Sequence, residues 1–161
     1  LTACYLTLWL DHGKDPAGGS YAYVLLPNKS AAQVAAYAAR PGIAILENSA
    51  EVHALKQCTL NMIGVNFWTD AVKNVDFITC DKKASVMIRE TAEEMEISVS
   101  DPTQENDGVI NLELARSASG VIARDPQIEV VRLHPTVRLA VHVGGQKGRS
   151  LKAAFSMLLR R

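Results

Sequence analysis

Cysteine, aromatic residues and long apolar runs are all scarce in this chain of 161 residues. The three cysteines, Cys4, Cys58 and Cys80, are too few and too widely spaced for a disulfide framework or a zinc site. We expect all three to be buried thiols, with a single bridge among them as the alternative. No apolar run approaches the roughly 20 residues that a membrane-spanning helix needs, so we expect no membrane span.

An excess of either charge is also lacking, because 17 basic residues balance 17 acidic ones. No sustained basic run offers a stripe for phosphates, so a nucleic-acid partner is not expected. A polyanionic ligand would have to be met by a local group of side chains. With 48% hydrophobic and 21% charged residues, the chain has the composition of an ordinary globular protein that can bury a core.

The first 40 residues predict two strands and one helix. Residues 3–10 and 21–26 are rich in aromatic and aliphatic side chains, which favours strands within a sheet. The alanine-rich run 31–40 predicts a helix, with Ser30 as its N-cap and Pro41-Gly42 as its end. This is the only helix we expect.

Beyond the helix, short runs of strand-like character are separated by polar turns. Spacing of this kind predicts an all-β fold, an antiparallel β-sandwich. In Val137–Val143, for example, Val137, Leu139 and Val141 alternate with Arg138 and His142, as on a strand with one buried face. We predict strands at 43–46, 51–59, 61–68, 76–79, 84–89, 95–100, 109–115, 128–133, 137–143 and 151–155.

We place a soft domain boundary where the helix ends and the regular series of strands begins. The predicted domains are residues 1–45, with the helix, and residues 46–161, the sandwich. The polar stretch 101–108 is interpreted as a loop between strands. Because the sequence opens inside an apparent strand, without a charged leader and apolar signal segment, we expect it to be a piece of a longer protein.

Candidate acid–base and metal-binding residues each have a simpler structural interpretation. Asp11 and His12 are expected to fix a loop by hydrogen bonds near Gly13. The scattered His53, His134 and His142 lack the spacing of metal ligands, and no metal site is predicted. The acidic group Glu90, Glu93, Glu94 and Glu96 is interpreted as a solvated turn. Asp101, Asn106 and Asp107 are too loosely spaced for a calcium site. Residues 143–150 are interpreted as a glycine-containing hairpin turn.

Aromatic side chains are the residues that a sugar-binding surface would use. The candidates are Trp9, Tyr21, Tyr23 and Trp68, although core packing is the simpler expectation for each. We keep Trp68 as the one candidate carbohydrate-binding residue.

Several segments, in order, carry a resemblance that covers essentially the whole chain. They include LTLWLDHG, YAYVLLPNKSAAQVAAYAARPGIAILENSAEVHAL, LNMIGVNFW and HPTVRLAVHVGGQKGRS. Together they resemble the C-terminal part of the polysaccharide lyases of family 8, which act on hyaluronan, chondroitin or xanthan. The resemblance implies that residues 1–45 end a large central β-sandwich and that residues 46–161 form a smaller C-terminal one.

The resemblance also implies a chemistry and a place for it. Members of this family cleave acidic polysaccharides by β-elimination: an asparagine neutralises the uronate carboxylate, a tyrosine or histidine abstracts the C5 proton, and the C4 oxygen leaves. Those residues belong to an upstream helical domain, so no catalytic residue is named in this chain and no cofactor is expected. Without the upstream helical and central β domains, the chain is expected to be inactive. The implied location is extracellular, by secretion.

Two other functions remain open. The first is a stand-alone carbohydrate-binding or adhesion module, in which exposed aromatic residues hold a polymer without cleaving it. The second is a hydrolase built on Glu93 and Glu94, which has little support. Among polysaccharides, we favour xanthan or hyaluronan as the substrate of the complete protein.

Overall fold

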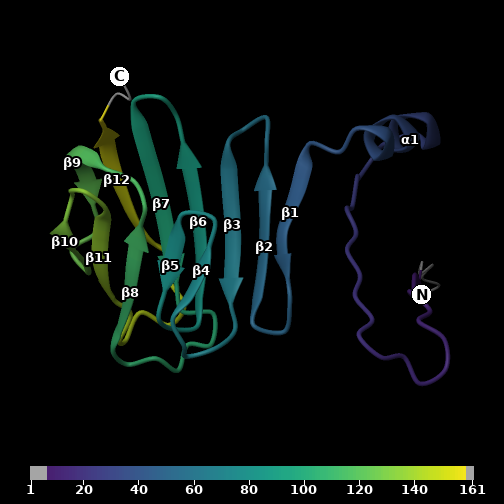
Figure 1. Cartoon of the computed structure of the whole chain (residues 1–161), viewed down its shortest axis with the longest axis horizontal. Coiled ribbons are helices and arrows are strands. Elements are labelled where there is room, and N and C mark those ends of the chain that lie inside the picture. The colour runs from purple at the N-terminus through teal and green to yellow at the C-terminus, as the bar shows by residue number, and fades with distance from the viewer. Residues whose placement is uncertain (1–6, 159–161) are drawn as a thin grey trace, which may run out of the picture. The chain divides into compact units, whose positions relative to one another are not determined.

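The computed structural model describes residues 7–158, and the chain divides into two compact units, Leu1–Ala39 and Arg40–Arg161. The first unit contains the helix α1 (Ala31–Ala39) (Figure 1). Its N-terminus carries a reciprocal cap: Gln33 N donates to Ser30 Oγ at 3.3 Å, and Ser30 N donates to Gln33 Oε1 at 2.9 Å. The predicted helix and its N-cap are confirmed.

The strands predicted in the first unit are absent from its described residues. No strand forms within residues 7–30, and positions 3–6 of the first predicted strand lie outside the described residues. Trp9, Tyr21 and Tyr23, expected in a core, are exposed by 80%, 61% and 70%. A strand needs a neighbour in a sheet, and in the described part of the chain residues 7–30 belong to neither sheet, so the apolar alternation alone does not produce a strand here.

The second unit consists of strands and loops within its described residues. Figure 1 labels its elements. The strands are β1 (Ile43–Asn48), β2 (Val52–Gln57), β3 (Met62–Phe67), β4 (Lys73–Val75), β5 (Ile78–Cys80), β6 (Ala84–Glu90), β7 (Glu94–Ser100), β8 (Val109–Leu114), β9 (Ala118–Arg124), β10 (Ile128–Arg132), β11 (Val137–His142) and β12 (Leu151–Met157).

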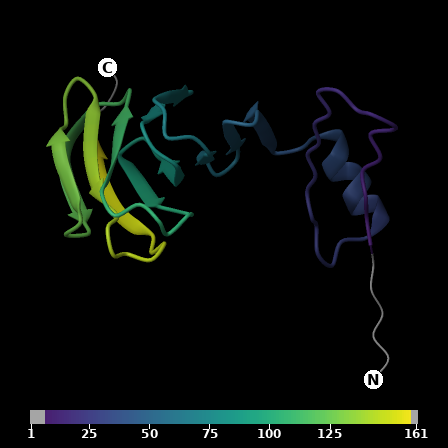
Figure 2. The same ribbon diagram turned by 90° about the horizontal axis from the view of Figure 1, so that it is seen from below.

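These strands form two antiparallel sheets that face each other (Figures 1 and 2). The larger sheet has seven strands in the order β1-β2-β3-β6-β7-β12-β9, and the smaller has five in the order β10-β11-β8-β5-β4. The strand β12 pairs with β7 on one side and with β9 on the other, and it thereby joins β9 to the rest of the sheet. The β-sandwich predicted from the sequence is confirmed.

The core lies between the two sheets. Strand alternation sends one side chain in two inward, as in β11, where Val137, Leu139 and Val141 are buried while Arg138 and His142 are exposed. The largest side chains that are almost fully buried come from both sheets. They are Phe67, Phe155, Ile78, Ile88, Met95, Ile110, Leu112, Leu114, Ile128, Leu139 and Leu151.

Ten predicted strands are found with small shifts of their ends, and two strands were missed, β4 and β9.

Among the cysteines, Cys80 is buried as expected, and burial raises the pKa of its thiol to about 11. The expectation for Cys58 is wrong, because it is exposed just after the end of β2. Cys4 lies outside the described residues. Within residues 7–158, no helix has the length and apolar character to cross a bilayer.

Two loops at one end of the sandwich pack closely. In the loop 101–108, the buried Asp101 carboxylate accepts hydrogen bonds from Thr103 N, Thr103 Oγ1 and Asn106 N. Burial alone would raise the pKa of Asp101, but these hydrogen bonds outweigh it and the pKa is lowered. In the loop between β11 and β12, Gly144 lies against this segment so closely that a Cβ there would be 2.3 Å from the Asp107 carbonyl oxygen.

Candidate functional site

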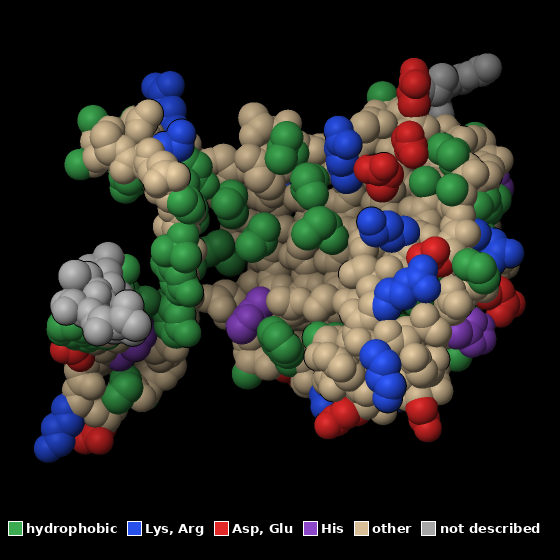
Figure 3. Space-filling view, turned by 180° about the vertical axis from the view of Figure 1, so that it is seen from behind, with side chains coloured by type: hydrophobic (Ala, Val, Ile, Leu, Met, Phe, Trp, Pro, Cys, Tyr) green, Lys and Arg blue, Asp and Glu red, His purple; other side chains and the backbone are tan. Residues whose placement is uncertain are grey.

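The candidate site lies on the outer face of the larger sheet, which is the face turned away from the five-stranded sheet (Figure 3). The register places outward side chains from consecutive strands in rows. One row runs Leu55, Gly64, Met87, Ser98 and Lys152, across β2, β3, β6, β7 and β12. Residues that are distant in the sequence thus share one surface, with apolar side chains toward β1–β3 and charged ones toward β7, β12 and β9.

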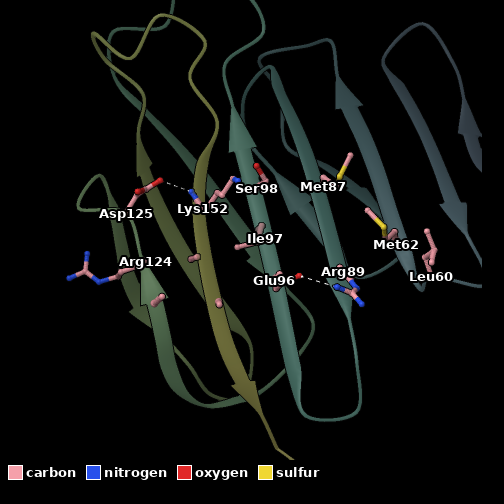
Figure 4. A pocket seen from close by; sticks show the side chains of 13 residues that line it. Leu60, Met62, Met87, Arg89, Glu96, Ile97, Ser98, Arg124, Asp125 and Lys152 are labelled. Atoms are coloured by element: carbon pink, nitrogen blue, oxygen red, sulfur yellow. Dashed lines mark hydrogen bonds and ion pairs between the residues drawn. The ribbon is translucent and has the colours of Figure 1, made fainter.

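The next row on this face runs Met62, Arg89, Glu96, Ala154 and Ala123. Both rows combine small residues with larger ones, and Ser98, Ala154 and Ala123 lie on the neighbouring strands β7, β12 and β9. The small side chains leave the face hollowed, and the hollow has a volume of about 780 Å³. Cavities of 300–1,000 Å³ are typical of small-molecule sites. We call this region the outer-face hollow; Figure 4 shows its lining.

Basic and acidic side chains both line the hollow. The basic ones are Arg89, Arg124 and Lys152, and the acidic ones are Glu96 and Asp125. Arg89 Nη1 lies 3.7 Å from Glu96 Oε2 in a loose, exposed pair. Within residues 7–158, no carboxylate lies within ion-pairing distance of Lys152 Nζ. The hollow therefore has a cationic group, Lys152, in the same row as the exposed Met87, with Ser98 between them.

Arg124 and Asp125 contribute less to the interior of the hollow. The Arg124 side chain points away from it in Figure 4, and its Nη1 donates to Ile128 O at 2.5 Å. Asp125 Oδ2 accepts a hydrogen bond from the backbone Lys152 N at 2.9 Å, and Asp125 Oδ1 lies 3.5 Å from Arg149 Nη2. Lys152 and Arg89 are thus the cations best placed to meet a ligand in the hollow.

Trp68 lies at the end of β3, toward the opposite end of these strands from Arg89. Its indole ring meets the His53 imidazole edge to face, with 5.6 Å between the ring centroids. The side chain is 40% exposed, so the expectation of a core position is wrong and a surface able to stack on a sugar ring is present. Neighbouring on the outer face, Ser85 Oγ donates to Asn66 Oδ1 at 2.7 Å. Sugar binding at Trp68 stays a prediction.

The other aromatic candidates gather in the first unit. Trp9, His12, Tyr21 and Tyr23 line a hollow of about 700 Å³ within that unit. The Tyr21 and Tyr23 rings are stacked, with 6.4 Å between their centroids. Asp11 Oδ1 accepts a hydrogen bond from Gly13 N at 2.8 Å, which confirms the loop-fixing role predicted for this carboxylate.

The remaining polar candidates occupy structural positions. Glu90 pairs with Arg116, and Glu96 with Arg89. His134 and His142 are exposed as expected, with His142 Nε2 3.7 Å from Glu129 Oε2. In the described part of the chain, no three His, Cys, Asp or Glu side chains converge as metal ligands would. The stretch 101–108 is a loop between strands, as predicted. The hairpin turn predicted at 143–150 is wrong, because this loop joins β11 and β12, which lie in different sheets and do not pair.

Sequence reasoning missed the outer-face hollow as a site. Arg89, Glu96 and Lys152 each alternate with buried neighbours, so their outward direction could be read from the sequence. Their proximity could not, because it depends on β12 pairing with β7, more than 50 residues earlier in the chain.

Two domains of one known protein family match this chain, each over its own segment. The polysaccharide lyase family 8 super-sandwich domain matches residues 1–38, and the C-terminal beta-sandwich domain of the same family matches residues 44–110. The xanthan lyase of Bacillus sp. (strain GL1) is 54% identical over 158 residues, covering 98% of this chain and 17% of that protein. The hyaluronate lyase of Thermasporomyces composti is 31% identical over 154 residues, covering 95% of this chain and 19% of that protein.

Solved structures of lyases are also similar to this chain. A Paenibacillus xanthan lyase superposes with a TM-score of 0.88 at 49% identity, covering 92% of this chain and 14% of that one. A Streptomyces coelicolor chondroitin AC lyase, solved in complex with chondroitin sulphate, gives a TM-score of 0.83 at 25% identity, over 92% of this chain and 20% of that one. The chain spans less than a fifth of the length of the two curated relatives.

Proposed function

Because this chain belongs to polysaccharide lyase family 8, we propose that it is the β-sandwich scaffold portion of a lyase that cleaves an acidic, uronate-containing polysaccharide by β-elimination. The observation that supports this most is the order of the two family segments, super-sandwich first and C-terminal sandwich second, along one short chain. Residues 1–45 then belong to the central sandwich, and residues 46–161 form the C-terminal one.

The exposure of the first unit supports a role as part of a larger assembly. Trp9, Tyr23 and Leu25 are each at least 70% exposed, although such side chains are normally buried. In the complete protein, further strands of the central sandwich would cover them and pair with the backbone of residues 7–27. The catalytic asparagine and the base would lie in the upstream helical domain, outside this chain. The complete protein would be secreted, since its polymeric substrate is outside the cell.

Xanthan is the substrate we favour for the complete protein. The support is the 54% identity to a xanthan lyase over nearly the whole chain, against 31% for a hyaluronate lyase. The purified chain should be mixed separately with xanthan, hyaluronan and chondroitin sulfate while the ultraviolet absorbance of the unsaturated uronate product is followed. We expect no absorbance change from this chain and a rise from the complete protein on xanthan. Product formation by the chain alone would contradict the scaffold proposal.

The scaffold role has its own test in the complete protein. Deleting residues 47–161 should lower the melting temperature, because a whole β-sandwich with its core would be removed. An unchanged melting curve would show that the C-terminal sandwich does not brace the rest.

A second candidate, a carbohydrate-binding module, has one supporting observation. Trp68 presents part of its ring to solvent next to His53 and the Asn66–Ser85 pair, which supplies amide and hydroxyl groups of the kind that bind sugar hydroxyls. This function would not need the missing domains.

A further inference from the structure

We propose that the outer-face hollow is a non-catalytic binding site for an acidic saccharide chain, with Arg89 and Lys152 as its anion-binding groups. The proposal rests on the proposed function, because an acidic polysaccharide is the polymer that the complete protein would meet. The site would hold the polymer on the C-terminal sandwich rather than cleave it.

The shape of the hollow suits an extended ligand. Its floor is formed by small side chains, among them Ser98, Ala123 and Ala154, on three neighbouring strands. Larger side chains stand along its sides, so that a flat, elongated molecule can lie across the strands in the space between them (Figure 4). The volume of about 780 Å³ is sufficient for a short run of sugar rings.

Charge selects an anionic ligand. Lys152 Nζ has no carboxylate within ion-pairing distance in the described residues, and the Arg89–Glu96 pair is exposed and 3.7 Å long. An exposed pair of this kind is weak and can yield Arg89 to a better partner. Asp125 is already engaged by Arg149 and by the Lys152 backbone, so it competes little for the Lys152 ammonium. Two cations are therefore available to ligand carboxylates.

The spacing of the two cations suits a polymer that carries several acidic groups. Arg89 is on β6 and Lys152 is on β12, with β7 between them, and their rows are two residues apart. With strands about 4.8 Å apart and a rise of about 3.4 Å per residue, their Cα atoms are separated by about 12 Å. Both side chains are long and flexible, so they can meet acidic groups on different sugars of one chain.

The apolar side of the hollow complements the faces of sugar rings. Leu60, Met62 and Met87 line it, and Met87 is 51% exposed. Methionine adapts its shape to a partner and offers a polarizable surface to the C–H groups of a ring. Met87 shares its cross-strand row with Lys152, so one ligand chain can contact both.

The test measures binding of the whole chain to xanthan at low ionic strength, with dextran as the uncharged polymer, by co-sedimentation or calorimetric titration. We expect xanthan to bind and dextran not to bind. Binding should weaken as salt is raised, because the anionic contacts are exposed. The double variant Arg89→Glu/Lys152→Glu should weaken binding about tenfold, as expected for the loss of two exposed charge contacts. Glu96→Gln, which frees Arg89, should tighten it.

Controls separate the site from net charge and from folding. Lys147→Glu, in the loop between β11 and β12, makes the same charge change as Lys152→Glu alone; it should leave xanthan binding unchanged, whereas Lys152→Glu should weaken it. Lys152→Met keeps a long apolar side chain on the strand and should weaken binding without lowering the melting temperature. Equal binding of xanthan by wild type and the double variant, or no binding by wild type, would overturn the inference. Neither result bears on the scaffold proposal. That proposal fails if the chain by itself forms the unsaturated product, or if deleting residues 47–161 leaves the melting curve of the complete protein unchanged.

Discussion

The guanidinium carbon of Arg116 lies 3.8 Å from the centroid of the Phe77 ring. The same side chain donates from Nε to Glu90 Oε1 at 2.7 Å, and both charged side chains are about four-fifths buried. Phe77 precedes β5 in the smaller sheet, whereas Glu90 ends β6 in the larger one. Arg116 therefore joins the two sheets through a cation–π contact and an ion pair.

Replacing Arg116 by alanine should destabilise the sandwich. The change removes the contact with Phe77 and leaves Glu90 partly buried without its cation, and we expect a loss of about 2 kcal/mol in the free energy of unfolding. Urea denaturation measures the change. Glu90→Gln is the matched control, because it removes the ion pair but keeps the stack on Phe77, and it should cost less. Equal losses for the two variants would show that the stack contributes nothing.

Acid sensitivity should depend on Glu113, on the outer face of the smaller sheet. Hydrogen bonds from Arg138 Nη2 at 2.6 Å and Thr136 Oγ1 at 2.7 Å lower the pKa of Glu113 from 4.5 to about 2. The folded state thus binds this proton less readily than the unfolded state does. The stability from Glu113 is present above pH 4.5 and disappears as the pH falls toward 2.

Melting temperatures of wild type and Glu113→Gln, measured from pH 6 to pH 2, test this relation. The variant should melt lower at pH 6, and the gap should close across the window from pH 4.5 to pH 2. A gap that stays constant over that window would contradict the role of the Glu113 charge.

The close approach at Gly144 should make this position intolerant of any side chain. A Cβ would lie 2.3 Å from the Asp107 carbonyl oxygen, a backbone atom that cannot turn aside. We expect Gly144→Ala to cost about 2 kcal/mol or more, by forcing the loops 101–108 and 143–150 apart. Gly120→Ala, where nothing lies within 4 Å of the added Cβ, should be neutral or mildly stabilising in thermal unfolding.

If the chain acts as a carbohydrate-binding module through Trp68, binding should survive high salt. Stacking of an indole ring on a sugar depends on apolar contact and is not screened by ions. Trp68→Ala should then abolish binding of a neutral oligosaccharide in calorimetric titration, whereas Trp68→Phe should retain part of it. Unchanged binding by the alanine variant would remove Trp68 from consideration.

The sandwich could be predicted from the sequence because its strands alternate regularly between buried and exposed side chains. The prediction was wrong where a segment becomes a strand only through pairing with another strand. The alternation of Val137, Leu139 and Val141 with polar residues predicts a half-buried strand, and Ser30 followed by Gln33 predicts the start of a helix. The strand β9 was missed because Ala118–Arg124 has little apolar alternation and is held in place by β12. Residues 21–26 have strand-like side chains but join neither sheet in the described part of the chain, so alternation was misleading there.

The candidate site was less predictable than the fold. Exposure of Trp68 could not be read from an apolar run that contains Phe67, which is fully buried one residue earlier. The grouping of Arg89 and Lys152 depends on strand order, which alternation does not specify. Residue types showed which groups could bind an anion, and only the sheet register showed which of them lie together.

The position of β12 between β7 and β9 governs when the second unit can be completed during synthesis. Until Leu151–Met157 has left the ribosome, β7 and β9 each have an open edge, and β9 cannot join the larger sheet. The larger sheet is therefore completed only when β12 is available, and a variant that lacks residues 151–157 would leave the facing edges of β7 and β9 unpaired, where they could pair with another chain.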